Sequence, residues 1–186
     1  MEPLRIYLLA GLLVHKAVWE VMKRNTTKTK NPPNLKSKLV KAVKIGILLG
    51  IVVQTLVEDV LPIAQDPASL RILGALIYSA GLAVALLGRI QLGQNWTDIE
   101  SAGVKQRHGL VSKGIYRLIR HPIYAGDLLL LLGLELALNS WLVVLVILLA
   151  PAVLRQAVRE ERMLQEILPG YRLYCERTKR FIPFLA

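Results

Sequence analysis

The stretch LRILGALIYSAGLAVALLGRIQL, residues 70–92, decides the fold class because it is a long apolar run bounded by arginines. An α-helix rises about 1.5 Å per residue, so a helix of this length crosses a hydrocarbon core of roughly 30 Å. Arg71 and Arg89 lie near its two ends, where long cationic side chains can extend to the membrane surface. The run therefore predicts a transmembrane helix.

Four further segments are candidate spans, and they differ in strength. Asn139 and Ser140 form a tight connection between the last two, which predicts an antiparallel helical hairpin. The first segment is the weakest, because it carries His15, Lys16 and Glu20. We expect an all-α integral membrane protein, a bundle of five transmembrane helices with a cytoplasmic C-terminal subdomain. The four further segments are residues 4–21, 41–61, 123–138 and 141–158.

The distribution of basic residues predicts the orientation of this bundle. Residues 23–44 contain eight Lys or Arg and no acid, and residues 93–121 and the tail after Arg155 are also basic. By contrast, the turn EDVLPIAQDPAS, residues 58–69, is acidic. With five spans the three basic segments share one face, which the positive-inside rule makes cytoplasmic. The N-terminus is then expected outside and the C-terminus inside.

Composition excludes several classes of protein. The net charge of +11 is compatible with nucleic-acid binding, but the charges cluster beside apolar segments, which favours a membrane partner and no nucleic acid. Cys175 is the single cysteine, so an intramolecular disulfide and a Cys-rich metal site are excluded, and we expect no metal. The N-terminal segment lacks a basic start and a small-residue cleavage site, so we interpret it as a retained span.

Five short motifs lie in the basic segments and their flanks, and together they are too specific for plain connectors. They are LGQNW (92–96), HGLVSKGIY (108–116), RHPIYAG (120–126), EE (160–161) and YRLYCERTKRFIP (171–183). Their pattern resembles the isoprenylcysteine carboxyl methyltransferase family of integral membrane enzymes. The resemblance is close over the C-terminal half, and it extends to the whole chain in length and span count.

The resemblance implies a methyltransferase that uses S-adenosylmethionine on a lipophilic acceptor from the bilayer, most simply a prenylcysteine-like or other lipid-like carboxylate. It implies one domain, residues 1–186, with three spans in 1–92 and the catalytic loops, last two spans and tail in 93–186. The substrate carboxylate would be held by Arg155 or Arg159, although the family's arginine position is occupied here by Gln156. The implied cofactor-binding residues are His108, Leu110, Val111, Tyr116, His121, Pro122, Tyr124 and Glu160.

The residues of RHPIYAG support such a site on physical grounds. The residue before a proline is pushed out of the α region, and proline is favoured at the first helical position. His121 is therefore expected just outside a helix that begins at Pro122, whose free backbone N–H groups would attract a carboxylate. Tyr116 and Tyr124 could present aromatic faces to an adenine or a sulfonium. The alternative for each residue alone is a cationic and aromatic membrane border.

Several ionisable residues near the predicted spans have no clear assignment from the sequence. Asp127, just inside a span, is either functional or paired with Arg120 or Arg117. His15 and Lys16 are expected to pair with an acid such as Glu20 or Glu135, or to mark a partly interfacial span.

Three other functions are compatible with the sequence. Related membrane methyltransferases act on phospholipid amines or small thiols. Membrane sterol reductases, which use NADPH, also resemble the C-terminal half, including RHPIYAGD and the YC…R…IP tail. The third is a basic membrane scaffold without enzymatic activity. The oligomeric state does not follow from the sequence.

Overall fold

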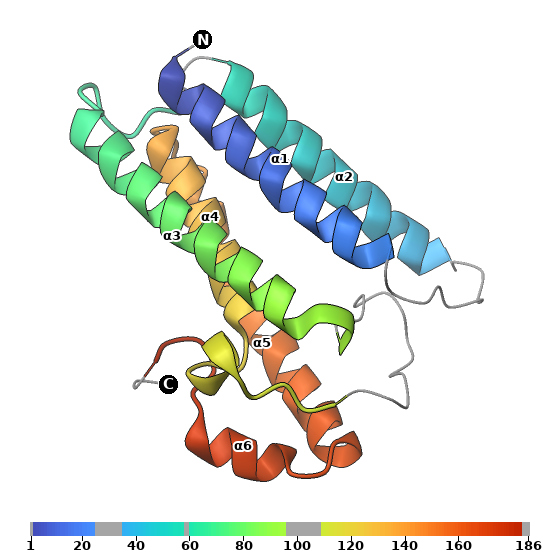
Figure 1. Ribbon diagram of the computed structural model, residues 1–186. Coiled ribbons are helices and arrows are strands. Elements are labelled where there is room, and N and C mark those ends of the chain that lie inside the picture. The colour runs from blue at the N-terminus through green and yellow to red at the C-terminus, as the bar shows by residue number, and fades with distance from the viewer. Residues whose placement is uncertain (1, 25–34, 58–59, 96–108, 184–186) are drawn as a thin grey trace.

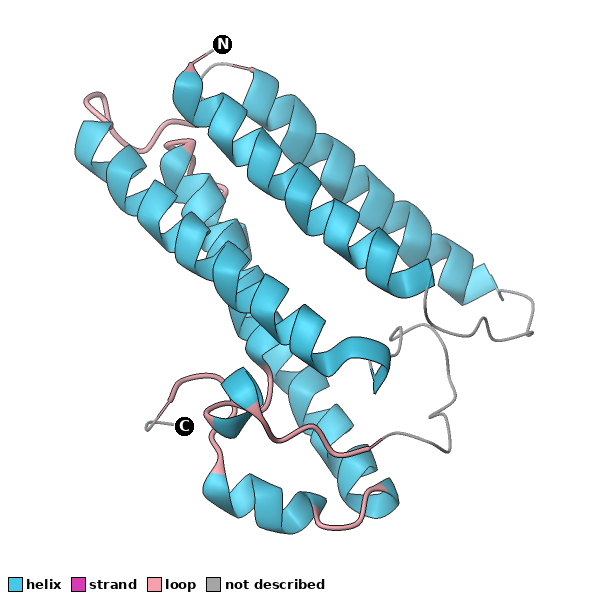
Figure 2. Cartoon of the chain, viewed as in Figure 1, coloured by secondary structure: helices cyan, strands magenta, loops and turns pink. Residues whose placement is uncertain are grey.

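The computed structural model describes residues 2–24, 35–57, 60–95 and 109–183, and this part of the chain is all helical (Figures 1 and 2). The five segments predicted as spans all fall in helices, and the predicted second span ends earlier, at Leu56. The short helix α6 was not predicted. The elements are α1 (Pro3–Arg24), α2 (Leu35–Leu56), α3 (Ala68–Leu92), η1 (Gly93–Asn95), η2 (Gly114–Arg117), α4 (Pro122–Ala137), α5 (Val143–Ile167) and α6 (Tyr171–Arg177).

Helices α3 and α4 form the closest pair, because glycines let their backbones touch. A Cβ atom on Gly81 would lie 2.3 Å from the backbone nitrogen of Leu130, and one on Gly133 would lie 2.2 Å from that of Tyr78. Gly126 packs in the same way against Ala85, at 2.4 Å. Small residues at helix interfaces are typical of membrane bundles, where close backbone packing replaces the hydrophobic effect.

One end of the bundle is closed by the α4–α5 connection and the turn before α3. Asn139 has a left-handed backbone, with φ of 54°, and its Oδ1 accepts hydrogen bonds from the backbone N–H groups of Ile63 and Ala64. This connection joins α4 and α5, which run in opposite directions as predicted (Figure 1). At the same end, Arg5 donates to the carbonyl of Thr55 at 3.1 Å and so caps α2. The described part of the acidic turn, residues 60–67, therefore lies at the end opposite to η2 and α6.

The two arginines of residues 70–92 have different surroundings. The Arg71 side chain is partly exposed and pairs with Glu2 at 3.3 Å. Arg89 is fully buried and donates from Nη1 to the carbonyl of Gly93 at 2.9 Å, which caps the C-terminal end of α3. The expectation that Arg89 extends to the membrane surface is therefore wrong, because its side chain is fully buried and its guanidinium turns back to the end of its own helix.

By length and composition, one helix within the described ranges, α3, can cross a membrane, and residues 45–56 of α2 form a shorter apolar stretch. The outward faces of α2 and α5 are nevertheless rich in exposed aliphatic side chains, among them Ile47, Val53, Leu145 and Leu148. Apolar surface of this extent is typical of a protein that contacts lipid or another apolar partner.

Candidate functional site

The site begins with the segment that connects η2 to α4. Gly114 has a φ of +62°, a conformation that favours glycine, and it starts a turn that Gln91 holds by accepting from the Ile115 N–H at 2.7 Å. The chain then runs beside the C-terminal tail. Arg120 donates its backbone N–H to Lys179 at 2.7 Å, and His121 donates to Arg180 at 3.0 Å. Two segments far apart in the sequence thus meet at the start of α4.

The start of α4 has the geometry that the His-Pro pair predicts. His121 is the N-cap, with φ of −122° and ψ of 57°, and Pro122 occupies the first turn. The side chain of His121 does not cap the helix. It stacks instead on two rings, with its centroid 5.5 Å from that of Tyr124 and 5.7 Å from that of Phe181. The predicted helix boundary is confirmed.

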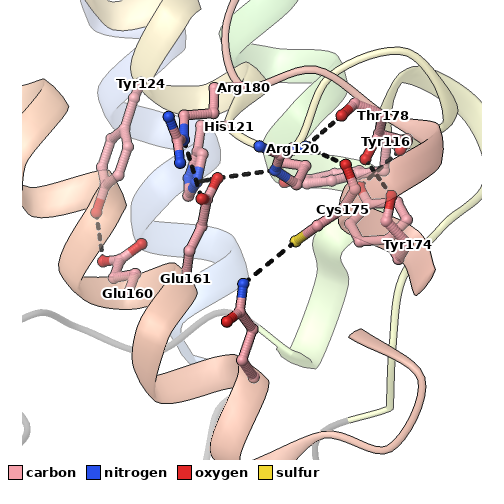
Figure 3. A network of polar contacts seen from close by, with 11 residues as sticks. Tyr116, Arg120, His121, Tyr124, Glu160, Glu161, Tyr174, Cys175, Thr178 and Arg180 are labelled. Atoms are coloured by element: carbon pink, nitrogen blue, oxygen red, sulfur yellow. Dashed lines mark hydrogen bonds and ion pairs between the residues drawn. The ribbon is translucent and has the colours of Figure 1, made fainter. Parts of the chain in front are cut away.

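Glu161 is the centre of the ionic contacts in this region (Figure 3). Its carboxylate accepts from Arg120 Nε at 2.8 Å and from Arg180 Nε at 2.9 Å, and it lies 3.2 Å from His121 Nε2. Burial alone raises the pKa of Glu161, but these hydrogen bonds outweigh it and lower the pKa to about 2. Glu161 is therefore ionised at neutral pH and joins α5 to the start of α4 and to the tail.

Arg120 extends this network into α6. Its Nη1 donates to the carbonyl of Cys175 at 2.9 Å and also to that of Thr178. Tyr174, on the same helix, donates to the carbonyl of Tyr116 at 2.7 Å, and burial raises the Tyr174 pKa to about 12. The tail is thus held against the η2 segment by side chains and by backbone.

The neighbouring Glu160 has different partners and a different exposure. It is partly exposed and accepts a short hydrogen bond, 2.5 Å, from the Tyr124 hydroxyl. Gln156, one turn earlier on α5, lies with its Nε2 3.5 Å from the same oxygen. Figure 3 shows the two glutamates directed to different partners, Glu161 to the arginines and Glu160 to Tyr124. Glu160 is therefore available to a ligand to a degree that Glu161 is not.

The structure brings together four of the residues implied by the resemblance: His121, Pro122, Tyr124 and Glu160. Leu110 and Val111 are partly exposed in the segment before η2, and His108 lies outside the described residues. Tyr116 is 5% exposed and its hydroxyl donates to the carbonyl of Gly88 at 3.2 Å, so little of its ring can face a ligand. Burial raises its pKa.

The two candidate substrate arginines lie beside the site. Arg155 and Arg159 are exposed on α5, about 100° around the helix from the row that holds Gln156 and Glu160. The neutral Gln156, and not a cation, shares the row of Glu160.

Asp127 pairs neither with Arg120 nor with Arg117, so that expectation is wrong. Its Oδ1 lies 3.0 Å from Nε2 of His15 on α1, while Arg120 is bound to Glu161 and to carbonyls of the tail. Glu20 and Glu135, the acids expected to pair with His15, bind other side chains. Glu20 accepts from Lys16 at 2.9 Å, which is one of the expected pairs, and Glu135 accepts from Gln54 at 2.7 Å.

Sequence reasoning missed Arg180 and Phe181 as parts of this region. Both lie in YRLYCERTKRFIP, a motif that the resemblance singled out. The motif therefore indicated this segment, but it did not predict that Arg180 contacts Glu161 or that Phe181 stacks on His121. Among the described residues, no group of three or more His, Cys, Asp and Glu side chains is placed to hold a metal ion.

Three curated proteins are similar to parts of the chain. The cobalt-zinc-cadmium resistance protein CzcN of Cupriavidus metallidurans is 35% identical over 57% of this chain and 47% of its own length. The protein-S-isoprenylcysteine O-methyltransferase A of Arabidopsis thaliana is 32% identical over 35% of this chain and 33% of its own. The nickel-cobalt-cadmium resistance protein NccN of Alcaligenes xylosoxydans xylosoxydans is 31% identical over 59% and 53%. The chain thus spans about half or less of their lengths.

Among solved structures, the fold matches that of the eukaryotic intramembrane Ras methyltransferase, isoprenylcysteine carboxyl methyltransferase, with a TM-score of 0.63. The match covers all of this chain and 69% of the other at 18% identity, so it speaks for the fold alone. The model of the phospholipid methyltransferase family matches residues 70–170, which run from α3 through α5 and include Glu160, Glu161 and the start of α4. That match covers more than half of the sequence, and the chain therefore belongs to the phospholipid methyltransferase family of membrane methyltransferases.

Proposed function

We propose that this protein transfers a methyl group from S-adenosylmethionine to a lipophilic acceptor that enters from the bilayer. The observation that carries the proposal is the pair of Tyr124 and the partly exposed Glu160, beside the N-terminus of α4 and inside the family-matched segment. The proposal includes the five-span topology, with the N-terminus outside and the site at the cytoplasmic end, where this cofactor is available.

The chemistry of the donor set fits the cofactor. S-adenosylmethionine carries an amine and ribose hydroxyls that the Glu160 carboxylate can accept from, and its carboxylate suits the positive end of a helix. Its sulfonium and adenine suit an aromatic face, such as the ring of Tyr124 stacked on His121. We assign Glu160, Tyr124, His121 and Pro122 to the cofactor.

When bound, S-adenosylmethionine supplies an electrophilic methyl group. The protein's part is to align the acceptor for in-line attack at about 3–3.5 Å and to exclude water. Glu161 contributes indirectly, because it fixes the positions of His121 and of the tail. An apolar border lowers the cost of bringing an acceptor from the bilayer to this depth.

The acceptor predicted from the sequence is a lipid-like carboxylate, as in prenylcysteine, held by Arg155 or Arg159. A carboxylate is ionised near pH 7 and needs no base. Gln156, which shares the helix face of Glu160, is neutral and cannot form an ion pair with such an acid. Our proposal therefore defines the acceptor by its bilayer-soluble tail and not by its head group.

The proposal is tested with the purified chain in nanodiscs, a total lipid extract and S-adenosylmethionine labelled in its methyl group. We expect label to move into an organic-soluble product, whose identification names the acceptor. The Glu160→Gln variant should transfer at least tenfold less, since a hydrogen bond to a charged group contributes about 1.5–3 kcal/mol. Label that stays in the aqueous phase with every extract contradicts the proposal.

A further inference from the structure

His15 of α1 and Asp127 of α4 form a polar pair inside two helices that we assign to the membrane. Nε2 of His15 lies 3.0 Å from Oδ1 of Asp127, and the imidazole stacks on Trp19 with centroids 4.1 Å apart and planes at 21°. The two side chains are 23% and 39% exposed. Ionisable residues within membrane helices are costly and are most often retained for a function.

The pair lies next to the proposed cofactor residues. Asp127 is three residues after Tyr124 and therefore one turn further along the same face of α4. Neighbouring turns of α4 thus carry two polar pairs, Tyr124 with Glu160 of α5 and Asp127 with His15 of α1. The second pair lies further toward the part of the bundle that we place in the bilayer.

The titratable and charged groups around the pair are few within the described part of the chain. On α4 and α5 they are the neutral Tyr124 hydroxyl and, through it, the Glu160 carboxylate. On α1, Lys16 and Glu20 bind each other at 2.9 Å. The residues of α3 that pack against α4 at this level, Gly81 and Ala85, carry no charge. The acid that faces His15 is Asp127.

An imidazole bound through one nitrogen to a carboxylate is suited to accept a proton at the other. Here Asp127 orients Nε2 as the donor, which leaves Nδ1 as the accepting nitrogen. We propose that the His15–Asp127 pair accepts the proton of the methyl acceptor, and that the acceptor therefore has a protic head group, N–H or S–H, on a bilayer-soluble tail. This inference rests on the methyl transfer proposed above.

The proposed reaction breaks two bonds and forms two. The acceptor's N–H or S–H bond breaks and its proton passes to Nδ1 of His15, whose positive charge Asp127 stabilises. The electron pair left on the acceptor forms the new bond to the methyl carbon, and the bond from that carbon to sulfur breaks with its pair retained by sulfur. No oxidant or reductant is needed.

The surroundings of Glu160 support a protic acceptor over an acid. The side chain beside it on α5 is the neutral Gln156, and the arginines 155 and 159 lie exposed on the adjacent face of the helix. An anionic acceptor in this place would face the Glu160 carboxylate without a cation from α5 opposite it, and like charges at short distance repel.

Three probes with the same tail test the inference: dodecylamine, dodecanethiol and dodecanoate, each offered with labelled S-adenosylmethionine to the chain in nanodiscs. We expect transfer to the amine or the thiol, and a loss of about a hundredfold or more in His15→Gln, the range of a general base. Asp127→Asn should lose less, and Lys16→Gln, which changes the neighbouring ion pair, should match the wild type. Binding of S-adenosylmethionine should be unchanged in all three variants.

A second readout does not depend on turnover. The chain has three histidines, so ¹⁵N-histidine NMR resolves His15 once His15→Gln identifies its signals. We expect a proton on Nε2 and none on Nδ1, and loss of this preference in Asp127→Asn. A proton on Nδ1 contradicts the inference.

The outcomes separate this inference from the proposed function. If S-adenosylmethionine does not bind the wild type, both fail. If it binds and dodecanoate alone is methylated, or if no probe is methylated, the proton-accepting role of His15 fails while the cofactor assignment stands. If His15→Gln transfers to the amine and the thiol as fast as the wild type, the pair is structural only and the inference is overturned.

Discussion

Glu161 connects three parts of the chain that the sequence separates by up to 60 residues. Arg120 and His121 approach it from the start of α4, and Arg180 from the tail. Its side chain is only 4% exposed. Breaking a buried ion pair by neutralising one partner is costly, because the remaining charges stay buried without compensation.

Glu161→Gln should therefore destabilise the protein by on the order of 3 kcal/mol, seen as a lower melting temperature in detergent. Glu166→Gln, an exposed acid on the same helix, is the matched control and should leave the melting temperature nearly unchanged. Equal melting temperatures for the two variants would show that Glu161 does not hold the tail and α4 together.

The same carboxylate gives a pH dependence with a defined sign. The pKa of Glu161 is about 2 in the folded chain against an ordinary value of 4.5, so the folded state binds fewer protons between these values. The stabilisation that ionised Glu161 contributes is complete above pH 4.5, its ordinary pKa, and is lost as the pH falls toward the pKa of the folded state. Wild-type melting temperatures should fall through this acid range more steeply than those of Glu161→Gln. Parallel curves would contradict the assignment.

For single residues, the sequence predicts where a residue lies in a helix better than it predicts which side chain that residue contacts. The rule for a residue before proline placed His121 correctly at the boundary of α4, because that rule is local. The partner of Asp127 was not predictable, since it comes from α1, 112 residues away. A contact across that separation depends on how α1 packs, which no local pattern contains.

Helices α3 and α4 owe their contact to glycines spaced seven residues apart, Gly74, Gly81 and Gly88 on one and Gly126 and Gly133 on the other. Seven residues are close to two helical turns, so each set lies along one face. This spacing was visible in the sequence and could have predicted the pair. The hydropathy of the two segments showed where the helices lie but not which faces meet.

Gly81→Leu should force α3 and α4 apart, because the first added carbon alone would lie 2.3 Å from the backbone nitrogen of Leu130. We expect a loss of about 1–3 kcal/mol or more, measured as a drop in melting temperature. Gly50→Leu on α2 is the control, since a Cβ atom there meets nothing within 4 Å. An unchanged melting temperature in Gly81→Leu would contradict the close packing.

The whole molecule has two unlike ends. The turn of residues 60–67 and the α4–α5 connection lie at one end, and η2, α6 and the C-terminal end of α5 lie at the other (Figure 1). The distribution of charge predicted this division, because the basic segments alternate with the apolar runs. How the tail folds back on α4 was not predicted, since that depends on a few ion pairs and not on hydropathy.

The proposed orientation is tested with single cysteines in a Cys175→Ser background. Asp66→Cys lies in the acidic turn and Lys113→Cys in the basic segment before η2, and both positions are exposed. In intact cells, a membrane-impermeant maleimide should label the variant at position 66, and should label the one at position 113 only after lysis. The reverse pattern would mean that the site faces outward.

The central claim is that the region around Tyr124 and Glu160 binds S-adenosylmethionine, and calorimetric titration of the chain in nanodiscs tests it most directly. We predict that S-adenosylmethionine binds the wild type, that NADPH does not, and that Glu160→Gln weakens binding by about tenfold or more while Glu166→Gln does not. Binding of NADPH in place of S-adenosylmethionine, or equal affinity of Glu160→Gln and the wild type for S-adenosylmethionine, would contradict the claim.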